Sequence, residues 1–366
     1  MSYDIIQLVT RSDTIGGVHN HIIDIISFTK KNNLKTLVLC GNSKEKKFIK
    51  RLEELNFDYE IVPSLKANIN LIYDLKTIFE LFILFKKNKP KLICLHSSKS
   101  GILGRLVSSF LRIPCIFTVH GWSFSIRTNF LVRTIYFVLE YILQFFCDHI
   151  ITDSFEDKKI ASKKFFFTDK ISSIPNSSSF LSQPPKNKND QVNFNYSNNE
   201  LNFLTIARFD HQKDHSTLFK GLALLPKEIK WKMFCVGDGP LFEKTKDYVK
   251  KLNLESKIIF TGFQKNLEVF YKKADVYLLI TNWEGMPITL LDAMNFSLPI
   301  IVTNVGGCSD VVSHGYNGYL IPKNSEKHLS YFLSSLSKKY KLRIEMGNQS
   351  KYLFNRLFSI EFFHKK

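Results

Sequence analysis

The sequence predicts an α/β protein of two Rossmann-like domains, each built on a parallel sheet, that face a cleft. Two observations lead to this prediction. Short apolar runs alternate with longer amphipathic runs, and one polar segment near the middle of the chain breaks that alternation. Strands that alternate with helices favour parallel sheets covered on both faces. The length of 366 residues agrees with two domains, since a domain holds roughly 150 residues.

The N-terminal half supplies the elements of the first sheet in order. Its predicted strands are apolar and often β-branched, and they are Asp4–Val9, Thr36–Cys40, Tyr59–Val62, Leu92–Leu95, Ile116–Val119, His149–Thr152 and Ile171–Ile174. The predicted helices between them are Val18–Lys31, Ser43–Leu55, Leu71–Lys87, Gly101–Leu111 and Arg127–Cys147. In Leu71–Lys87 the apolar residues recur at spacings of three and four, as on one face of a helix.

A segment rich in Ser, Asn and Pro then separates the two halves, and the alternation resumes after it. The predicted strands of the second half are Asn202–Ala207, Lys232–Val236, Lys257–Thr261, Val276–Ile280, Ile300–Thr303 and Tyr319–Ile321. From about Ser325 the chain reads as helical. We therefore expect a first domain at 1–176, a linker at 177–200, a second domain at 201–340 and a helical tail at 341–366 that packs back on the first domain.

Composition excludes several classes of protein. Apolar residues make up 44% and charged residues 23% of the chain, which excludes collagen, a disulfide scaffold, wholesale disorder and a polytopic membrane protein. The six cysteines show no Cys-x-x-Cys spacing, so we expect free thiols in a reducing compartment. The N-terminus lacks the pattern of a signal peptide, and the greasy run 135–147 is shorter than the roughly 20 residues of a spanning helix. A cytoplasmic location is expected.

The positive charge is unevenly placed. Lys and Arg number 51 against 33 Asp and Glu, a net charge of +18, and residues 81–139 contain nine Lys or Arg and no acid. One interpretation is a lysine-rich composition with a chance gap in acids. The other is a basic surface that faces anionic lipid or a phosphorylated partner. Composition leaves both open.

Glycine pairs follow predicted strands at three places, namely Gly16-Gly17, Gly237-Asp238-Gly239 and Gly306-Gly307. Glycine lets an anion approach backbone N–H groups at a helix N-terminus, where the helix dipole is positive. Each pair alone is typical of an ordinary turn, but three at strand ends favour an anion site. The dinucleotide and Walker motifs are absent, and so is Asp-x-Asp, which argues against a metal-bridged diphosphate.

Charged residues gather in two further loops of the second half. Arg208 and Lys213 follow a predicted strand and are suited to clamp a diphosphate. Glu284 precedes Gly285-Met286-Pro287, where Pro287 suits the first turn of a helix. The N–H groups near Ile288 to Leu290 would then be free for phosphate, with Asp292 about one turn further in. Read singly, these are ordinary surface cations and a helix start.

Taken in order, these motifs resemble the retaining GT-B glycosyltransferases of family 4, over nearly the whole chain. The segments that carry the resemblance are Glu-Gly-x-Pro at 284–287, Ala-Arg-Phe at 207–209 with Gln-Lys at 212–213, Val-Gly-Asp-Gly-Pro at 236–240, Phe-Thr-Gly-Phe at 260–263 and Ile-Pro-Asn at 174–176. Gly-Gly-Val at 16–18, HSSKSGILGR at 96–105 and FTVHGW at 117–122 are similar to members that assemble capsule, exopolysaccharide or O-antigen.

The resemblance implies a role for each of these positions. Its catalytic set would be Glu284, Arg208, Lys213 and His120, and its donor-binding set Gly16, Gly17, Gly237, Gly239, Gly285, Met286, Pro287, Ile288, Leu290 and Asp292. Asp292 stands where the family usually has Glu to bind the ribose, so that contact would be longer or water-mediated. The acceptor set would be His96, Lys99, Arg105 and Trp122. A turn at the strand end is the alternative for His96 and Lys99, and core packing is the alternative for Trp122.

The function implied is transfer of a sugar, with retention, from a nucleotide-sugar that is expected to be UDP-linked. The acceptor would be a polyprenyl-diphosphate-linked saccharide, and the domains at 1–176 and 201–340 would be the acceptor side and the donor side. No metal and no nucleic acid are expected, and the protein would lie peripherally on the anionic inner face of the cytoplasmic membrane. The alternatives are a nucleotide-sugar epimerase of similar architecture, a basic nucleic-acid-binding protein and an inactive scaffold.

Overall fold

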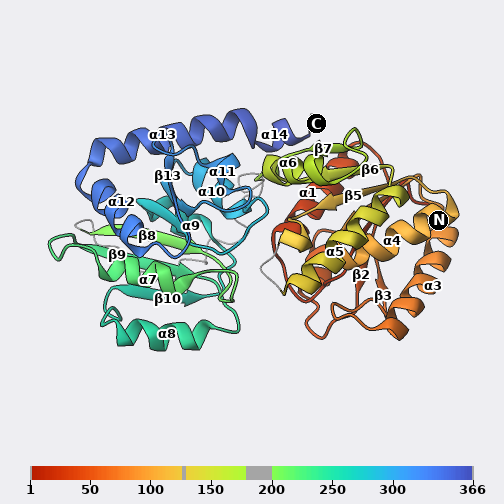
Figure 1. Ribbon diagram of the computed structural model, residues 1–366, viewed down its shortest axis with the longest axis horizontal. Coiled ribbons are helices and arrows are strands. Elements are labelled where there is room, and N and C mark those ends of the chain that lie inside the picture. Colours follow the sequence, from red (N-terminus) through yellow and green to blue (C-terminus); the bar gives the residue numbers. More distant parts are fainter. Residues whose placement is uncertain (1, 126–128, 179–199, 365–366) are drawn as a thin grey trace. The chain divides into compact units, whose positions relative to one another are not determined.

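The computed structural model describes residues 2–125, 129–178 and 200–364. The chain divides into two compact units, Met1–Asn176 and Ser177–Lys366. Most of the predicted linker, residues 179–199, lies outside the described residues. Each unit contains a parallel sheet covered by helices (Figure 1).

The first unit alternates strands and helices from its start. It contains β1 (Ile5–Val9), α1 (Gly17–Lys31), β2 (Thr36–Gly41), α2 (Lys47–Glu54), β3 (Tyr59–Val62), α3 (Leu71–Asn88), β4 (Leu92–His96), α4 (Ser98–Leu111), β5 (Cys115–Val119), η1 (Ser123–Ser125), α5 (Phe130–Leu143), η2 (Gln144–Phe146), β6 (His149–Thr152), α6 (Phe155–Lys164) and β7 (Ile171–Ser173). The strands form one seven-stranded parallel sheet in the order β3-β2-β1-β4-β5-β6-β7.

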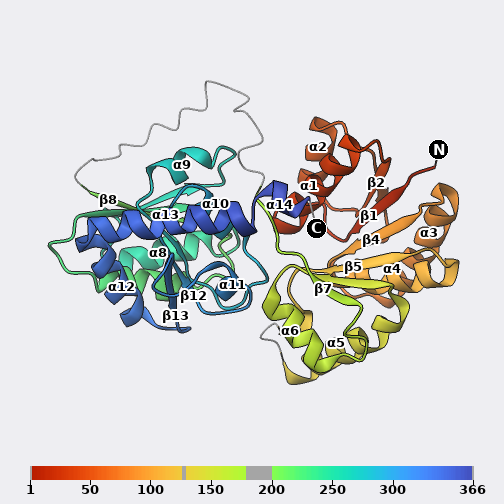
Figure 2. The same ribbon diagram turned by 90° about the horizontal axis from the view of Figure 1, so that it is seen from above.

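The strand order indicates which strand ends of this sheet are suited to bind a ligand. The order reverses between β1 and β4, where Val9 lies opposite His96. Helices α1 and α2 cover one face of the sheet, and α3, α4 and α5 cover the other (Figure 2). Ligands of open α/β sheets bind at the carboxyl ends of the strands near such a reversal. The helix N-termini that follow those strands lie at the same edge.

The second unit repeats the pattern with its own core. It contains β8 (Leu201–Ile206), α7 (His215–Ala223), β9 (Trp231–Val236), α8 (Phe242–Lys251), β10 (Ile258–Gly262), α9 (Glu268–Lys273), β11 (Val276–Leu279), α10 (Ile288–Asn295), β12 (Ile300–Thr303), α11 (Cys308–Val311), β13 (Gly318–Ile321), α12 (Glu326–Lys338), α13 (Tyr340–Leu357) and α14 (Ile360–Phe363). Its six strands are parallel in the order β10-β9-β8-β11-β12-β13.

The helix α13 covers most of the predicted tail and packs against α10 inside the second unit. Phe354 and Phe358 are buried in the same apolar cluster as Leu290 and Leu291 of α10. Lys351 adds a polar contact, because its Nζ donates to the backbone oxygen of Asn295 at 2.9 Å. The last long helix is therefore part of the core of this unit.

The prediction of two parallel-sheet, Rossmann-like domains is confirmed. The apolar runs that the sequence analysis assigned to strands lie in the buried cores of the two units. The six cysteines are free. Among the described residues, every helix is too short or too polar to cross a bilayer.

Candidate functional site

The second unit brings Lys213 and Glu284 together at the carboxyl end of its sheet. Lys213 closes the loop after β8 and Glu284 lies in the loop after β11. The Lys213 ammonium forms an ion pair with Glu284 Oε1, and the two side chains are 14% and 7% exposed. Glu284 also accepts hydrogen bonds from Thr281 Oγ1 at 2.8 Å and from Gln212 Nε2 at 3.1 Å. Both carboxylate oxygens are therefore held by the protein.

Backbone contacts fix these two loops against each other. The Asp214 N–H donates to the Ile280 carbonyl at 2.9 Å, and the Asn282 N–H donates to the Gln212 carbonyl at 2.8 Å. Lys213 and Thr281 form an isolated β-bridge. The position of the ammonium relative to the carboxylate is thus set by main-chain geometry, which is more rigid than two long side chains alone would be.

A third loop supports Glu284 from behind. Gly306, in the loop after β12, has φ +48°, and a Cβ there would lie 1.9 Å from the Glu284 carbonyl oxygen. The neighbouring Gly307 N–H donates to the Gly285 carbonyl at 2.9 Å. Glycine is required at position 306 because both the left-handed backbone and the close approach exclude a side chain.

Gly237 and Gly239 have a similar role beside Arg208. Gly237 has φ +134°, and a Cβ there would lie 2.0 Å from the Ala207 carbonyl oxygen. A Cβ at Gly239 would lie 2.4 Å from the Phe209 carbonyl oxygen. These glycines allow the loop after β9 to pack on the loop that carries Arg208. The Arg208 side chain is half exposed, 3.8 Å from Asp210, and remains available to an anionic ligand.

The helix α10 begins where the sequence predicts an anion site. Pro287 is the residue that precedes its first turn, no described side chain caps that turn, and the turn contains no acid. The Leu290 N–H already donates to the Pro287 carbonyl at 3.1 Å. Met286, Pro287 and Leu290 are buried, whereas Ile288 is partly exposed. Leu290 and Met286 therefore anchor the loop, and the N–H groups at the start of the helix are the part suited to phosphate.

Asp292, the residue predicted to bind the ribose, is buried and already hydrogen-bonded to other side chains. Its side chain is buried and accepts hydrogen bonds from the Ser178 hydroxyl and, at 3.4 Å, from the Tyr271 hydroxyl. Burial, together with the nearby Asp292 carboxylate, raises the pKa of Tyr271 well above its usual range, so this hydroxyl stays a donor. A ribose hydroxyl would have to share or replace these partners.

In the first unit, Gly16 and Gly17 lie at the N-terminus of α1, as predicted. The Gly16 N–H donates to His19 Nδ1 at 3.2 Å, and His19 Nε2 contacts the Arg11 carbonyl at 3.0 Å. An added Cβ at Gly16 would meet nothing within 4 Å. The backbone at this helix start is therefore open, and His19 is a structural residue that holds it.

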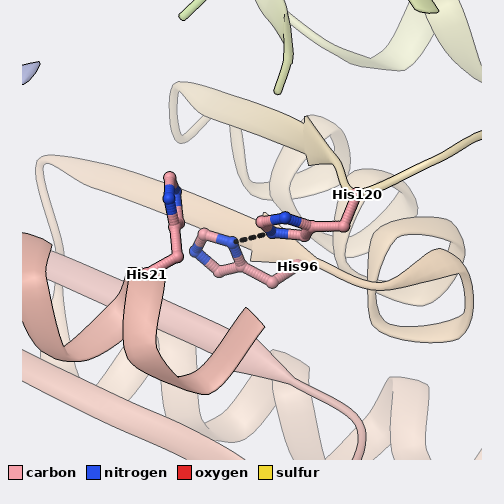
Figure 3. Close-up of side chains that lie close together, drawn as sticks. All are labelled: His21, His96 and His120. Atoms are coloured by element: carbon pink, nitrogen blue, oxygen red, sulfur yellow. Dashed lines mark hydrogen bonds between the residues drawn. The ribbon is translucent and has the colours of Figure 1, made fainter. Parts of the chain in front are cut away.

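Three histidines meet at the carboxyl edge of the first sheet (Figure 3). His96 Nδ1 and His120 Nε2 are 3.3 Å apart and their rings stack. The His21 ring, from α1, is edge-on to both, with ring centroids 5.6 Å and 5.1 Å away. Burial lowers the pKa of His21 to about 3 and that of His120 to about 4, and it holds the pKa of His96 well below its usual range. All three imidazoles are therefore neutral at pH 7.

The cluster belongs to a longer chain of polar side chains. His96 Nε2 lies 2.6 Å from Gln7 Oε1, and His120 Nδ1 lies 3.4 Å from Asp153 Oδ2. Asn176 Nδ2 donates to the same Asp153 oxygen at 3.2 Å. Gln7, His96, His120 and Asp153 come from β1, from the end of β4 and from just after β5 and β6, which are neighbours in the sheet. The chain of contacts thus runs across the strand ends.

This cluster is the one group of metal-ligand type among the described residues, with ligand atoms within 4.8 Å of one another. Neutral imidazoles are suitable ligands for zinc and similar ions. Both ring nitrogens of His96 and of His120 already face protein partners, however. A metal ion would have to replace the contact between these two rings.

The structure places the four predicted acceptor residues in or near the interior of the first unit. His96 and Arg105 are fully buried, and Trp122 is almost so. Lys99 forms an ion pair with Asp74 and donates to the Asn68 carbonyl, which ties the start of α4 to the region before α3. His96 and Lys99 remain at the carboxyl edge of the sheet.

The structure places Arg105 and Trp122, two residues of the predicted acceptor set, in the core of the first unit. Arg105 faces inward from α4, where its guanidinium pairs with Glu140 of α5 at 2.7 Å and lies over the Phe117 ring at 4.2 Å. The Trp122 Nε1–H donates to the Asp157 carbonyl at 2.9 Å, and the indole stacks on Phe124. Both side chains are buried and make these contacts inside the core of the first unit.

Sequence reasoning missed the residues that hold the charged groups. Gln212 and Thr281 bind Glu284, while Gln7 and Asp153 bind the histidine pair. A usable signal existed for two of them, because Thr281 and Asp153 closely follow strands whose carboxyl ends form the ligand edge. Gln7 lies within β1 and carried no such signal.

Comparisons with known proteins agree with this architecture. A model of Glycosyltransferase Family 4 matches residues 15–177, and a model of Glycosyl transferases group 1 matches residues 186–352. A UDP-Gal:alpha-D-GlcNAc-diphosphoundecaprenol alpha-1,3-galactosyltransferase of Escherichia coli is 32% identical over 275 residues, which cover 72% of this chain and 70% of that protein. The capsular polysaccharide biosynthesis glycosyltransferase CapM of Staphylococcus aureus is 25% identical over 369 residues, covering 97% and 93% of the two chains.

Solved structures show the same fold. HepE of Anabaena, crystallised in complex with UDP, has a TM-score of 0.81 at 16% identity, covering 100% of this chain and 98% of that chain. WaaG, a glycosyltransferase of lipopolysaccharide biosynthesis, has a TM-score of 0.75 at 14% identity, covering 99% and 98%. None of these matched proteins is named as an epimerase or a nucleic-acid-binding protein. The chain therefore belongs to the glycosyltransferases of family 4, with the two Rossmann-like domains of the GT-B fold.

Proposed function

We propose that this glycosyltransferase moves a hexose or N-acetylhexosamine, with retention of configuration, from a UDP-sugar to a polyprenyl-diphosphate-linked saccharide. The observation that carries the proposal is the Lys213–Glu284 pair, which lies beside the open start of α10 at the carboxyl edge of the second sheet. The pair places a cation that can bind a diphosphate next to a carboxylate that can bind sugar hydroxyls. Support for the substrates comes from those of the Escherichia coli relative, a UDP-galactose donor and a diphosphoundecaprenol-linked acceptor, and from the UDP complex of HepE.

The donor diphosphate would replace Glu284 as a partner of Lys213. Arg208 is half exposed and would add a second cation, and the N–H groups at the start of α10 would add a third positive element. As the glycosidic bond breaks, negative charge grows on the leaving phosphate, and donors already aimed at it lower the barrier. This arrangement supplies, without a metal, the charge that a divalent cation would provide.

Glu284 would then bind hydroxyls of the donor sugar. Thr281 and Gln212 hold its carboxylate in place whether or not Lys213 stays bound. Gly285 and Gly306 let the loop approach the ligand closely. Gly237 and Gly239 shape the nucleotide site by packing on the Arg208 loop. Asp292 would reach the ribose through a shared contact with Ser178 or Tyr271.

The first unit would bind the acceptor and would also contribute to donor binding. The open backbone at Gly16 and Gly17 suits a phosphate, and His120 at the strand edge would lie near the donor sugar. His96 and Lys99 would line the acceptor side. We place the reaction at the inner face of the cytoplasmic membrane, with the protein held peripherally, because residues 81–139 carry nine basic residues and no acid. The products would serve the assembly of a surface polysaccharide such as capsule or O-antigen.

The test is a transfer assay with a panel of UDP-, GDP- and ADP-sugars and a synthetic GlcNAc-diphosphate lipid, with and without EDTA. We expect one UDP-sugar to react, equal rates with EDTA, and an α-linked product from an α-linked donor by NMR. A β-linked product would refute retention, and loss of activity in EDTA would refute metal independence. Conversion of the nucleotide-sugar in the absence of acceptor would show an epimerase instead.

A further inference from the structure

The outer surface of the first unit carries two stripes of exposed apolar side chains. On α3 the exposed residues are Ile72, Leu75, Phe79 and Ile83, at helical spacings of three, four and four. They lie opposite a buried stripe that includes Leu81 and Phe85. Helix α3 is therefore apolar on two faces, only one of which the core covers.

Helix α5 shows the same pattern independently. Leu131, Ile135, Val138 and Ile142 are exposed at spacings of four, three and four, while Glu140 on the same helix is buried. Helix α4 contacts both α3 and α5. It adds Phe110, which is 77% exposed and whose ring lies 5.9 Å from that of Phe82 on α3. The three helices cover the same face of the sheet (Figure 2), so they form one surface, here called the α3–α5 face.

The few acids near this face are all engaged by contacts within the first unit. Residues 63–147 contain three acids, Asp74, Glu80 and Glu140. Asp74 pairs with Lys99, Glu80 accepts hydrogen bonds from the Ser64 N–H and hydroxyl, and Glu140 pairs with buried Arg105.

Positive charge remains exposed on the same face. The exposed cations on the three helices or near their ends are Lys66, Lys76, Lys86, Lys87, Lys89, Arg112 and Arg133, of which Lys87 pairs with Glu60 at 3.3 Å. The Lys66 ammonium lies over the Tyr73 ring at 3.6 Å, at the exposed start of α3. A surface that is apolar at its centre and cationic around it is complementary to an anionic bilayer.

Among the described residues, four of the five most exposed large apolar side chains lie where the acceptor would arrive. Ile69, Leu71 and Ile72 surround the N-terminus of α3, and Phe130 and Leu131 begin α5. The N-termini of these helices follow β3 and β5, so they belong to the carboxyl edge of the sheet. Lys99 is tied to Asp74 of α3 and to the Asn68 carbonyl, so it lies beside the same exposed segment.

From this arrangement we propose that the α3–α5 face is a membrane-insertion surface, in which apolar side chains of α3 and α5 enter the boundary of an anionic phospholipid bilayer while the surrounding lysines bind headgroups. The surface brings Lys99, at the carboxyl edge of the sheet, close to the membrane, so that a diphosphate lipid can approach this edge without leaving the bilayer. This inference rests on the proposed function for its acceptor, but the binding to lipid itself does not depend on it.

The experiment measures flotation of the full chain with vesicles of phosphatidylglycerol and phosphatidylcholine, and with phosphatidylcholine alone. The wild type should partition onto the anionic vesicles and weakly onto the neutral ones. The variant Ile72→Asp/Leu131→Asp should lose about 100-fold or more in partition coefficient, because burial of each large apolar side chain is worth about tenfold or more. The control Leu224→Asp/Tyr331→Asp, which changes two similarly exposed apolar residues of the second unit, should bind like the wild type. Lys86→Glu/Lys87→Glu should weaken binding to anionic vesicles only.

Several results would overturn the inference. They are a wild type that stays in solution with both vesicles, an insertion variant that floats like the wild type, or a control that loses binding equally. Light scattering without lipid gives another such result, because a dimer that Ile72→Asp/Leu131→Asp dissociates would show that a second copy covers the face.

Sugar transfer is measured in parallel. The insertion variant should act normally on a short-chain, water-soluble acceptor and lose activity on vesicle-embedded acceptor. No transfer by the wild type with any donor, together with normal flotation, would refute the proposed function and leave this inference standing.

Discussion

The substitution Glu284→Gln should tighten the binding of UDP while it slows sugar transfer. In the free protein the Lys213 ammonium is paired with Glu284, with both side chains mostly buried. A diphosphate must therefore compete with a carboxylate for the same cation. The glutamine side chain introduced by Glu284→Gln has the same size and keeps an oxygen for the hydrogen bond from Thr281 Oγ1, but it carries no negative charge.

The size of the effect follows from the charges. Two unit charges about 4 Å apart interact by about 4 kcal/mol at an effective dielectric constant of about 20, before desolvation and hydrogen bonding offset much of it. We expect about 1–2 kcal/mol of this to appear as tighter binding, which is a factor of about 5 to 30 in the Kd of UDP. Transfer should fall by about 100-fold or more, because Glu284 would no longer bind the sugar hydroxyls as an anion.

Isothermal titration of UDP and a transfer assay measure the two effects on one protein sample. The matched control is Glu243→Gln, which removes a carboxylate paired with Lys246 on exposed α8 in the same unit. It should change neither quantity. If Glu284→Gln binds UDP as the wild type does, or more weakly, then Lys213 does not exchange Glu284 for a phosphate and the reasoning fails.

Three further predictions follow from the geometry. Gly306→Ala should lower the melting temperature and weaken UDP binding at least tenfold. The added Cβ would lie 1.9 Å from the Glu284 carbonyl oxygen, and the backbone at this position has φ +48°. Unchanged UDP binding, measured by calorimetry, would contradict this packing. The free energy of unfolding should fall from pH 6.5 toward pH 4, by about 1.4 kcal/mol per pH unit for each histidine that is buried in its neutral form. The reason is that folding lowers the pKa values of His21 and His120 to about 3 and about 4, so that only the unfolded chain takes up the protons in this range. Urea unfolding of His21→Gln should show a shallower dependence of this free energy on pH, and an equal dependence would refute the assignment. Arg105→Met should lower the free energy of unfolding by about 3–5 kcal/mol, because it leaves the buried Glu140 carboxylate without its ion-pair partner. The double variant Arg105→Met/Glu140→Gln should recover most of this loss and leave the KM for acceptor unchanged. A raised KM would indicate instead that Arg105 binds the acceptor.

The fold followed from the sequence because strand and helix periods are local properties. Buried parallel strands such as Val276–Leu279 are continuous apolar runs, and the helices between them repeat at three and four. Neither signal depends on knowing the partner of a strand. Small differences arose at element ends, where the predicted helix from Gly101 begins at Ser98, and the short helix α6 was not predicted.

The contacts of the candidate site residues could not be predicted from the sequence, because position at a strand end does not fix the direction of a side chain. Arg105 follows a motif of the family resemblance, yet it points inward from α4 because Glu140 of α5 faces it. That pairing depends on which helices are neighbours, which no short motif encodes. The same limit hid Gln7, whose contact with His96 follows from β1 and β4 being adjacent in the sheet. Lys213 and Glu284 follow the neighbouring strands β8 and β11, and the structure shows that their side chains form an ion pair, which the sequence analysis did not predict.

The functional charges of each unit are held by protein partners when no ligand is bound. Lys213 is paired with Glu284 and Asp292 is bound by Ser178 and Tyr271, while in the first unit Asp153 is bound by Asn176 and His120. A buried charge without a partner would cost several kcal/mol, so these contacts keep the loops folded in the free enzyme. On the proposed function, a donor diphosphate would exchange with Glu284 at Lys213. The exchange would replace a carboxylate by a group of greater charge, which would favour binding of the intact nucleotide-sugar over that of a neutral sugar. Selectivity for an anionic donor would then depend on the charge that the enzyme gives up as well as on the charge that it offers.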